Sequence, residues 1–249
     1  MQHPIQRFRL TVAYDGTAYA GWQVQPGDPT VQQTIETALA VIVGAPVKIH
    51  GSGRTDQGVH AARQVAHFDL QRAVPLQTLT RGLNGLLPKD IRVGRVTKAA
   101  ADFHARRSAT GKEYRYFIWN AELMSPFLRR YRAHVKPPLN VAAMREAAAH
   151  LVGRHDFAAF TANPNRAVES TIRNLTLLAV SKRGRTVTIT ARADGFLYRM
   201  VRSLAGFLIR VGEGAVSPGE APSILSSRTR TARVPTAPPQ GLFLWNVKY

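Results

Sequence analysis

Two kinds of hydrophobic pattern alternate along the first hundred residues. Between residues 8 and 14 every second side chain is apolar, which predicts a strand with one buried face. Thr30 and Gln33 form a capping-box pattern, and the apolar positions that follow at helical spacing predict a helix ending at Gly44. The other elements expected here are strands over residues 47–50, 64–68 and 91–96 and a helix over 75–87.

The second half of the chain repeats this mixture. Residues 113–119 are rich in aromatic side chains, which is typical of strands, and Asn140 precedes a helical pattern ending near Leu151. Two strands are expected over 174–180 and 186–193, on either side of a turn at 182–185. A helix over 197–211 and a strand over 241–249 complete the prediction.

Because strands and helices interleave in both halves, the pattern alone predicts a mixed α/β chain with one or two lobes. We place a division between an N-terminal domain, residues 1–105, and a C-terminal domain, residues 106–249. A chain of 249 residues that is 45% hydrophobic can bury one large core or two modest ones.

The charge of the chain narrows the class of partner. Lys and Arg number 34 against 15 Asp and Glu, a formal net charge of +19 that attracts a polyanion. A membrane surface is the weaker option, because the sequence has no run of 18 apolar residues and no export signal. The expectation is an RNA- or DNA-binding protein of the cytoplasm. The chain has no cysteine, which excludes disulfides and thiolate metal sites.

One loop concentrates candidate chemistry. Residues 51–58 contain three glycines, Arg54 and Asp56, and glycine lets another molecule approach the backbone closely. A carboxylate held beside an arginine is a candidate nucleophile or base that stays ionised. The alternative is a solvated turn, since Gly, Asp, Ser and Thr are ordinary turn residues.

The sequence of this loop resembles a known motif. Residues 53–61 read Gly-Arg-Thr-Asp-Gln-Gly-Val-His-Ala, which matches the G-R-T-D-x-G-V-H-A motif of the tRNA pseudouridine synthase A family. Four further segments resemble the family's other signatures in the same order: 14–23 with 30–32, then 114–116, 195–202 and 237–242. Five ordered matches across the chain identify it as similar to that family along most of its length.

The resemblance implies a fold and an activity. Such enzymes have two α/β subdomains on a continuous, mainly antiparallel mixed sheet, with a basic RNA-binding cleft between them. They isomerise uridine to pseudouridine at positions 38–40 of the tRNA anticodon stem-loop and use no cofactor. They act as homodimers, with the tRNA lying across both subunits.

The resemblance also assigns roles to individual residues. Asp56 matches the catalytic aspartate, which attacks C1′, attacks C6 or assists an elimination through C2′; the sequence leaves these three open. Arg54 would help to displace the target nucleotide, or would neutralise a phosphate. Tyr114 would stack on the uracil and move a proton through its hydroxyl, or would be a core residue of a strand.

Two more positions complete the expected site. Arg202 matches the basic partner of the catalytic aspartate; spacing alone would instead put it on a solvated helix face with Arg199 and Arg210. Arg199 stands where many relatives have a histidine, so we expect nothing beyond a phosphate contact. Leu242 matches a residue that lines the uracil pocket, and would otherwise be strand core.

Three other functions compete with this hypothesis. A non-catalytic RNA-binding or tRNA-folding protein fits the charge but leaves Asp56 unexplained. A nucleotide-binding loop would need G-x-x-x-x-G-K-[ST], which is missing here. A metal site is not expected, because His60, His67, His104 and His155 lack metal-ligand spacing and no H-E-x-x-H occurs.

Overall fold

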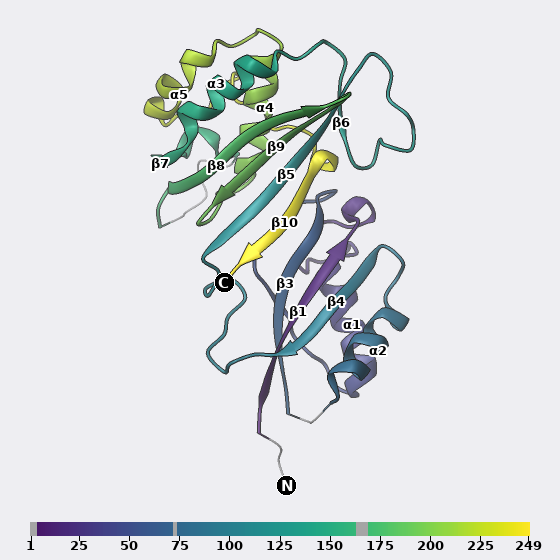
Figure 1. Cartoon of the computed structure of the whole chain (residues 1–249). Helices are drawn as coiled ribbons and strands as arrows, with labels where there is room; N and C mark the ends of the chain where they lie inside the picture. The colour runs from purple at the N-terminus through teal and green to yellow at the C-terminus, as the bar shows by residue number, and fades with distance from the viewer. Residues whose placement is uncertain (1–3, 72–73, 163–168) are drawn as a thin grey trace. The chain divides into compact units, whose positions relative to one another are not determined.

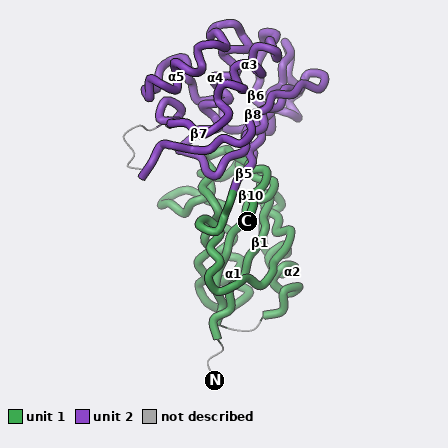
Figure 2. Tube along the Cα trace, turned by 60° about the vertical axis from the view of Figure 1, so that its left-hand side comes forward, with its two compact units in different colours: residues 1–110, 244–249 green, residues 111–243 purple. Residues whose placement is uncertain are grey.

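The computed structural model describes residues 4–71, 74–162 and 169–249, and the chain divides into two compact units. Unit 1 is formed by the chain up to Thr110 together with 244–249, and unit 2 by 111–243 (Figure 2). The last segment of the chain therefore belongs to the same unit as the first.

Unit 1 is a small sheet with two helices on one face (Figure 1). Its strands lie in the order β4-β1-β3, with the short β2 beside β3, and every pair is antiparallel. The elements are β1 (Gln6–Tyr14), the 3-10 helix η1 (Gly16–Ala18), α1 (Val31–Val43), β2 (His50–Gly51), β3 (His60–Leu70), α2 (Leu76–Leu86) and β4 (Ile91–Lys98).

Local sequence accounts for the first strand and helix. The apolar face of β1 is buried, and Phe8 stacks on Phe68 of β3 with ring centroids 5.4 Å apart. At the start of α1 the Thr30 hydroxyl oxygen accepts a hydrogen bond from the Gln33 backbone N–H (3.3 Å), and Gly44 ends the helix with φ 73°. Both predicted elements are confirmed.

In unit 2, too, helices cover one face of the strands (Figure 1). Its strands lie in the order β5-β9-β8-β7, and β6 pairs with β5 in parallel. The elements are β5 (Gly111–Asn120), β6 (Ala133–Val135), α3 (Val141–Leu151), β7 (Gly153–Asp156), η2 (Ala158–Phe160), β8 (Ile172–Arg183), β9 (Thr186–Ala193), α4 (Met200–Gly212), η3 (Pro218–Glu220), α5 (Ala221–Ser227) and η4 (Pro239–Gly241). The final strand, β10 (Leu242–Lys248), begins in unit 2 and ends in unit 1.

The fold class is as expected from the sequence: mixed α/β with mainly antiparallel strands. The predicted hairpin of β8 and β9 is confirmed around Gly184, which has φ 56°. The cap of α3 is confirmed too, since the Asn140 side-chain oxygen accepts a hydrogen bond from the Ala143 N–H (3.1 Å). Over the described residues, no helix is both long enough and apolar enough to cross a membrane.

Two predicted elements are wrong in their bounds. The strand expected over 47–50 shrinks to His50–Gly51, because the backbone of Ile49 bonds to side chains of α1 instead of a strand. Its N–H donates to Glu36 Oε1 (3.0 Å) and its carbonyl accepts from Gln32 Nε2 (3.1 Å). The helix expected from residue 197 begins only at Met200, because Arg199 takes a left-handed conformation with φ 54°.

Candidate active site

The first half of the loop 51–61 is tied to β3 by a buried amide. Gln64 is fully buried, and its Nε2 donates to the Gly53 carbonyl (2.9 Å) while its Oε1 accepts from the Ser52 hydroxyl. The Ser52 backbone N–H donates to the Val65 carbonyl (2.7 Å). Because a buried polar group must keep its partners, these bonds hold the entry to the loop in one conformation.

The second half of the loop is seated on the segment that follows β1. A Cβ added at Gly16 would overlap the Val59 carbonyl oxygen, and one added at Gly21 would lie 2.5 Å from the Thr55 oxygen. Only glycine permits backbones to approach this closely. Thr55 is hydrogen-bonded through both its backbone and its side chain. Its carbonyl accepts from the Trp22 N–H (3.1 Å), and its hydroxyl lies 2.8 Å from the Tyr14 hydroxyl.

His60 also helps to hold the loop against the segment that follows β1. The ring is fully buried, and Nδ1 accepts a hydrogen bond from the Gly16 backbone N–H (3.0 Å). Among the residues the structure describes, no group of three or more His, Asp or Glu side chains is placed to hold a metal ion. The function of His60 here is to fix Gly16 beneath the loop.

Asp56 and Arg54 lie at the tip of this loop. The Asp56 carbonyl accepts from the Val59 N–H (3.1 Å), closing a turn in which Gly58 has φ 74°. The Asp56 side chain is half-buried. Arg54 is exposed, and its Nε donates to Gln23 Oε1 (3.1 Å), so the seating segment also orients this guanidinium.

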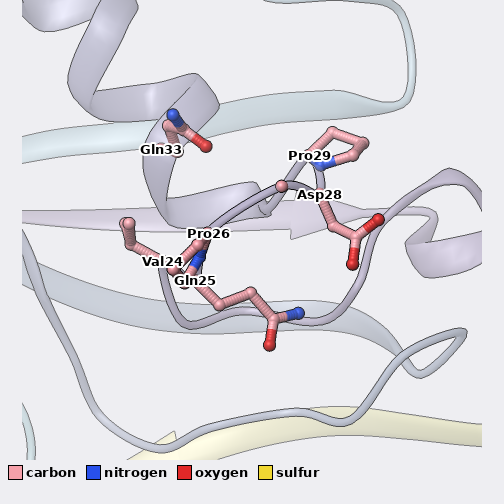
Figure 3. Close-up of a pocket in the computed structure, with 7 residues that line it drawn as sticks. Val24, Gln25, Pro26, Asp28, Pro29 and Gln33 are labelled. Carbon is pink, nitrogen blue, oxygen red and sulfur yellow. The ribbon is translucent and has the colours of Figure 1, made fainter.

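Beyond Gln23 the chain borders an open hollow of about 610 Å³ (Figure 3). Its lining is Val24, Gln25, Pro26, Gly27, Asp28, Pro29 and Gln33. This lining contains a carboxylate and no basic side chain, so the hollow does not suit a phosphate. The candidate residues Arg54 and Asp56 lie outside it.

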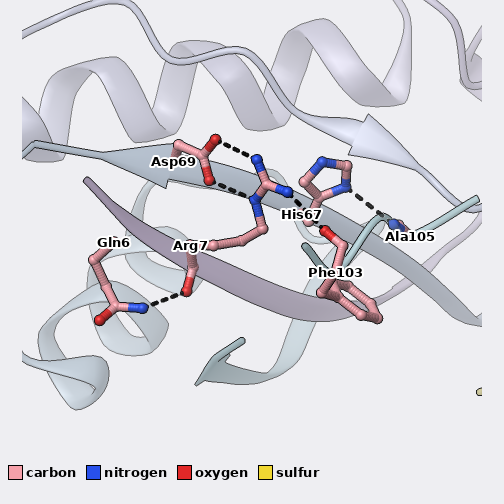
Figure 4. Close-up of polar contacts among 6 residues, drawn as sticks. All are labelled: Gln6, Arg7, His67, Asp69, Phe103 and Ala105. Atoms are coloured by element: carbon pink, nitrogen blue, oxygen red, sulfur yellow. Dashed lines mark hydrogen bonds and ion pairs between the residues drawn. The ribbon is translucent and has the colours of Figure 1, made fainter. Parts of the chain in front are cut away.

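A cluster of polar contacts joins β1, β3 and the segment after β4 (Figure 4). Arg7 binds both carboxylate oxygens of Asp69 (2.8 and 2.7 Å) and donates to the Phe103 carbonyl (2.9 Å). The hydrogen bond from Arg7 holds the pKa of Asp69 below its usual value. His67 Nδ1 accepts from the Ala105 N–H (3.2 Å).

The His67 ring is unusually hard to protonate. Burial is the main cause, and the charges of nearby His104, His50 and Arg7 add to it, lowering the pKa of His67 to about 4. The ring centroids of His50 and His104 lie 5.0 and 4.7 Å from that of His67. A neutral His67 therefore links β2, which leads into the loop, to the segment around Ala105.

In unit 2, Tyr114 stands on β5 opposite Ala191 of β9. Its side chain is 8% exposed, and its ring makes an edge contact with Phe196 (centroids 5.1 Å apart). Two residues along the strand, Tyr116 is fully buried, donates its hydroxyl to the Pro238 carbonyl (2.9 Å) and packs against Gly241. Tyr116 is thus a core residue of unit 2.

Arg202 is not a solvated side chain. It is 9% exposed on α4, and its Nε donates to the Ala237 carbonyl (2.8 Å), while the Ala237 N–H donates back to the Arg202 carbonyl (3.0 Å). The alternative in which Arg202 lies on a solvated helix face is therefore wrong. Leu242, 5% exposed, is the first residue of β10 and follows the same segment.

Comparison with known proteins identifies the family. The family described as "tRNA pseudouridine synthase" matches residues 10–106 and 147–249. The chain belongs to this family.

Three relatives are named "tRNA pseudouridine synthase A", and the chain is similar to each along nearly all of its length. The protein of Geotalea uraniireducens (strain Rf4) is 46% identical over 98% of this chain and 100% of its own. That of Myxococcus xanthus is 46% identical over 98% and 92%. That of Bacillus subtilis (strain 168) is 44% identical over 98% and 99%. The family expected from the motifs is confirmed.

For this member of the tRNA pseudouridine synthase family, the structure adds a residue that sequence reasoning missed. Arg230 donates to the Ser203 hydroxyl on α4 and to the Thr236 hydroxyl (both 2.7 Å). Burial, with the charge of Arg199, lowers the pKa of Arg230. It pins the segment before Ala237 to the helix that carries Arg202. No motif pointed to it, and one of its two partners, Ser203, lies 27 residues away in the sequence.

Proposed function

We propose that this member of the tRNA pseudouridine synthase family converts uridine to pseudouridine at positions 38–40 of the tRNA anticodon stem-loop, with Asp56 as the catalytic carboxylate. The observation that carries the proposal is the seating of the motif loop. Thr55 and Val59, which flank Asp56, lie against Gly21 and Gly16 so closely that any side chain there would collide. A carboxylate carried on a backbone held this firmly suits attack on a bound nucleotide.

The reaction rearranges bonds within one nucleoside. The bond from N1 of uracil to C1′ breaks, the base rotates, C5 joins C1′, C5 loses its proton and N1 gains one. Atoms and electrons balance without a redox partner or water, so the proposal includes no cofactor. Asp56 would act at C1′, at C6 or as the base at C2′.

The other candidates have complementary roles in the proposal. Tyr114, buried on a strand beside Phe196, stacks on the uracil and relays a proton. Arg202, desolvated and fixed by Ala237, supplies positive charge to the reaction. Arg54 helps to displace the target nucleotide, and Leu242 lines the uracil pocket.

The partner in the proposal is tRNA, attracted by a formal net charge of +19. A homodimer in the cytoplasm belongs to the same proposal, and light scattering after gel filtration measures the oligomer. A protein that only binds or folds RNA is not favoured, because it gains nothing from a carboxylate placed to face phosphates.

Asp56→Asn tests the catalytic assignment. The change keeps the shape of the side chain but removes its charge and its nucleophilic or basic oxygen, so we expect single-turnover pseudouridine formation to fall below detection. Binding of the same tRNA should survive or tighten slightly. Asp28→Asn, the same change in another loop of unit 1, is the matched control and should remain active. Substantial turnover by Asp56→Asn would refute the assignment, and loss of binding with an intact fold would make Asp56 a recognition residue.

A further inference from the structure

The connection between β5 and β6, residues 121–132, carries two large apolar side chains that are exposed to solvent. Phe127 is 86% exposed and Leu123 80%, the two highest values for large apolar residues in the described part of the chain. Figure 1 shows this connection as a long loop that extends beyond the ends of the strands of unit 2. Exposing an aromatic ring is costly in water, so the exposure needs a reason.

The loop holds the ring out on an ordered backbone. Two successive turns form it, because the Leu128 N–H donates to the Ser125 carbonyl (3.0 Å) and the Tyr131 N–H to the Leu128 carbonyl (2.9 Å). At the base, Trp119 Nε1 donates to the Leu123 carbonyl (2.8 Å). His134 Nε2 lies 2.8 Å from the Ala121 carbonyl oxygen.

An aromatic layer supports these turns from within unit 2. The Arg132 guanidinium lies 4.6 Å from the centroid of the Phe117 ring, and Phe117 makes an edge contact with Phe243 (5.4 Å). Tyr131 lies 6.5 Å from Phe243. Tyr131 and Arg132 thus contact aromatic rings at the base of the loop, whereas Phe127 stays exposed.

The segment that carries the exposed ring has an excess of positive charge. From residue 121 to 136 the chain carries Arg129, Arg130, Arg132 and Lys136 against a single carboxylate, Glu122, a formal charge of +3. Arg129 and Arg130 are exposed, and Arg129 Nη1 donates to the Pro126 carbonyl (2.7 Å), which keeps its guanidinium next to Phe127. An exposed aromatic between arginines suits an unpaired base with its phosphates.

We propose that the loop 121–132 is an additional RNA-binding site, in which Phe127 stacks on an unpaired base of tRNA while Arg129 and Arg130 neutralise neighbouring phosphates. The inference rests on the proposed function in that tRNA is the ligand. A contact between two copies of the loop is disfavoured, because a two-fold contact centred on Phe127 would bring the arginines of both copies together.

Three variants of Phe127 separate stacking from simple apolar contact. Binding to an unmodified tRNA transcript is measured by fluorescence anisotropy at fixed salt. Phe127→Ala and Phe127→Leu should each weaken binding roughly tenfold, the scale of one lost stacking contact, whereas Phe127→Trp should keep wild-type affinity. Val41→Ala, which shortens a 66%-exposed side chain of α1, is the control and should change nothing. With binding measured over a series of salt concentrations, Arg129→Ala should lower the slope of log K against log[salt] by about one.

Unchanged affinity in Phe127→Ala would overturn the proposal. So would wild-type affinity in Phe127→Leu, because leucine keeps apolar contact but cannot stack. Conversion of a dimer to a monomer by Phe127→Ala, seen by light scattering, would assign the ring to a subunit interface instead. Binding to the transcript requires no isomerisation, so failure of the catalytic assignment at Asp56 would leave this test intact.

Discussion

The candidate residues of the two units are held in different ways. In unit 1, Arg54 and Asp56 stand on a loop that Gln64 ties to β3 at its entry and whose second half is fixed by backbone pressed against backbone. In unit 2, Tyr114 and Arg202 stand on a regular strand and helix, and side chains such as Phe196 and Arg230 fix their surroundings. The first arrangement should fail when atoms are added to the backbone, and the second when the chemistry of a side chain changes.

Gly16→Ala should break the unit 1 arrangement most severely. The new Cβ would overlap the Val59 carbonyl, which must shift and take the Asp56 turn with it. We expect a loss of about 3 kcal/mol in the free energy of unfolding, the upper range for overpacking, with a large loss of activity. Urea unfolding and single-turnover kinetics measure the two effects.

Gly85→Ala is the matched control for that variant. Gly85 lies in α2, and nothing within 4 Å would meet an added Cβ. Replacing a helical glycine by alanine should stabilise the protein by about 0.4–1 kcal/mol. Equal effects of the two alanines would mean that close backbone contact does not seat the loop.

The His67 cluster makes the flank of the same loop sensitive to acid. A free histidine has a pKa near 6.5, and that of folded His67 is about 4, so between these values the unfolded chain binds more protons. Stability should be complete above pH 6.5 and fall by up to about 3 kcal/mol as the pH drops to 4.

His67→Asn isolates this contribution. The asparagine oxygen can accept the Ala105 N–H but does not titrate, so the variant should lose much less stability than the wild type from pH 6.5 to 4. Denaturant unfolding over this range measures the difference. Parallel curves for the two proteins would remove His67 as the source.

Tyr114→Phe probes the unit 2 arrangement. The ring and its contact with Phe196 remain, so affinity for tRNA and stability should hold. Loss of the hydroxyl should slow the chemical step roughly 10²-fold, the scale of a proton transfer. Single-turnover rates at saturating tRNA give the answer, and a rate close to wild type would make Tyr114 a packing residue.

The same contrast explains what the sequence could predict. The bounds of α1 follow from Thr30 and Gly44, which act through neighbouring residues. The missing strand before His50 could not be foreseen, because Glu36 and Gln32 satisfy the Ile49 backbone from a helix more than ten residues away. Periodicity likewise assigned nothing to the loop 51–61, whose importance came from its resemblance to a family motif.

The candidate site shows the same limit. Helical spacing alone put Arg202 on a solvated face, whereas the structure buries it against Ala237. That burial depends on the course of a segment 35 residues further along the chain. Arg230, which helps to fix this segment, had no sequence signal at all. Long-range pairings of this kind set how a motif residue is held, and only the folded chain shows them.

The division of the chain also sets an order of events during synthesis. The Thr110 N–H donates to the Lys248 carbonyl (2.9 Å), and the Tyr249 hydroxyl donates to the Ala105 carbonyl (2.7 Å), so residues 244–249 complete unit 1. A ribosome makes these residues only after all of 111–243. The unit that is begun first is therefore finished last, because unit 1 lacks its C-terminal segment until all of unit 2 has been synthesised.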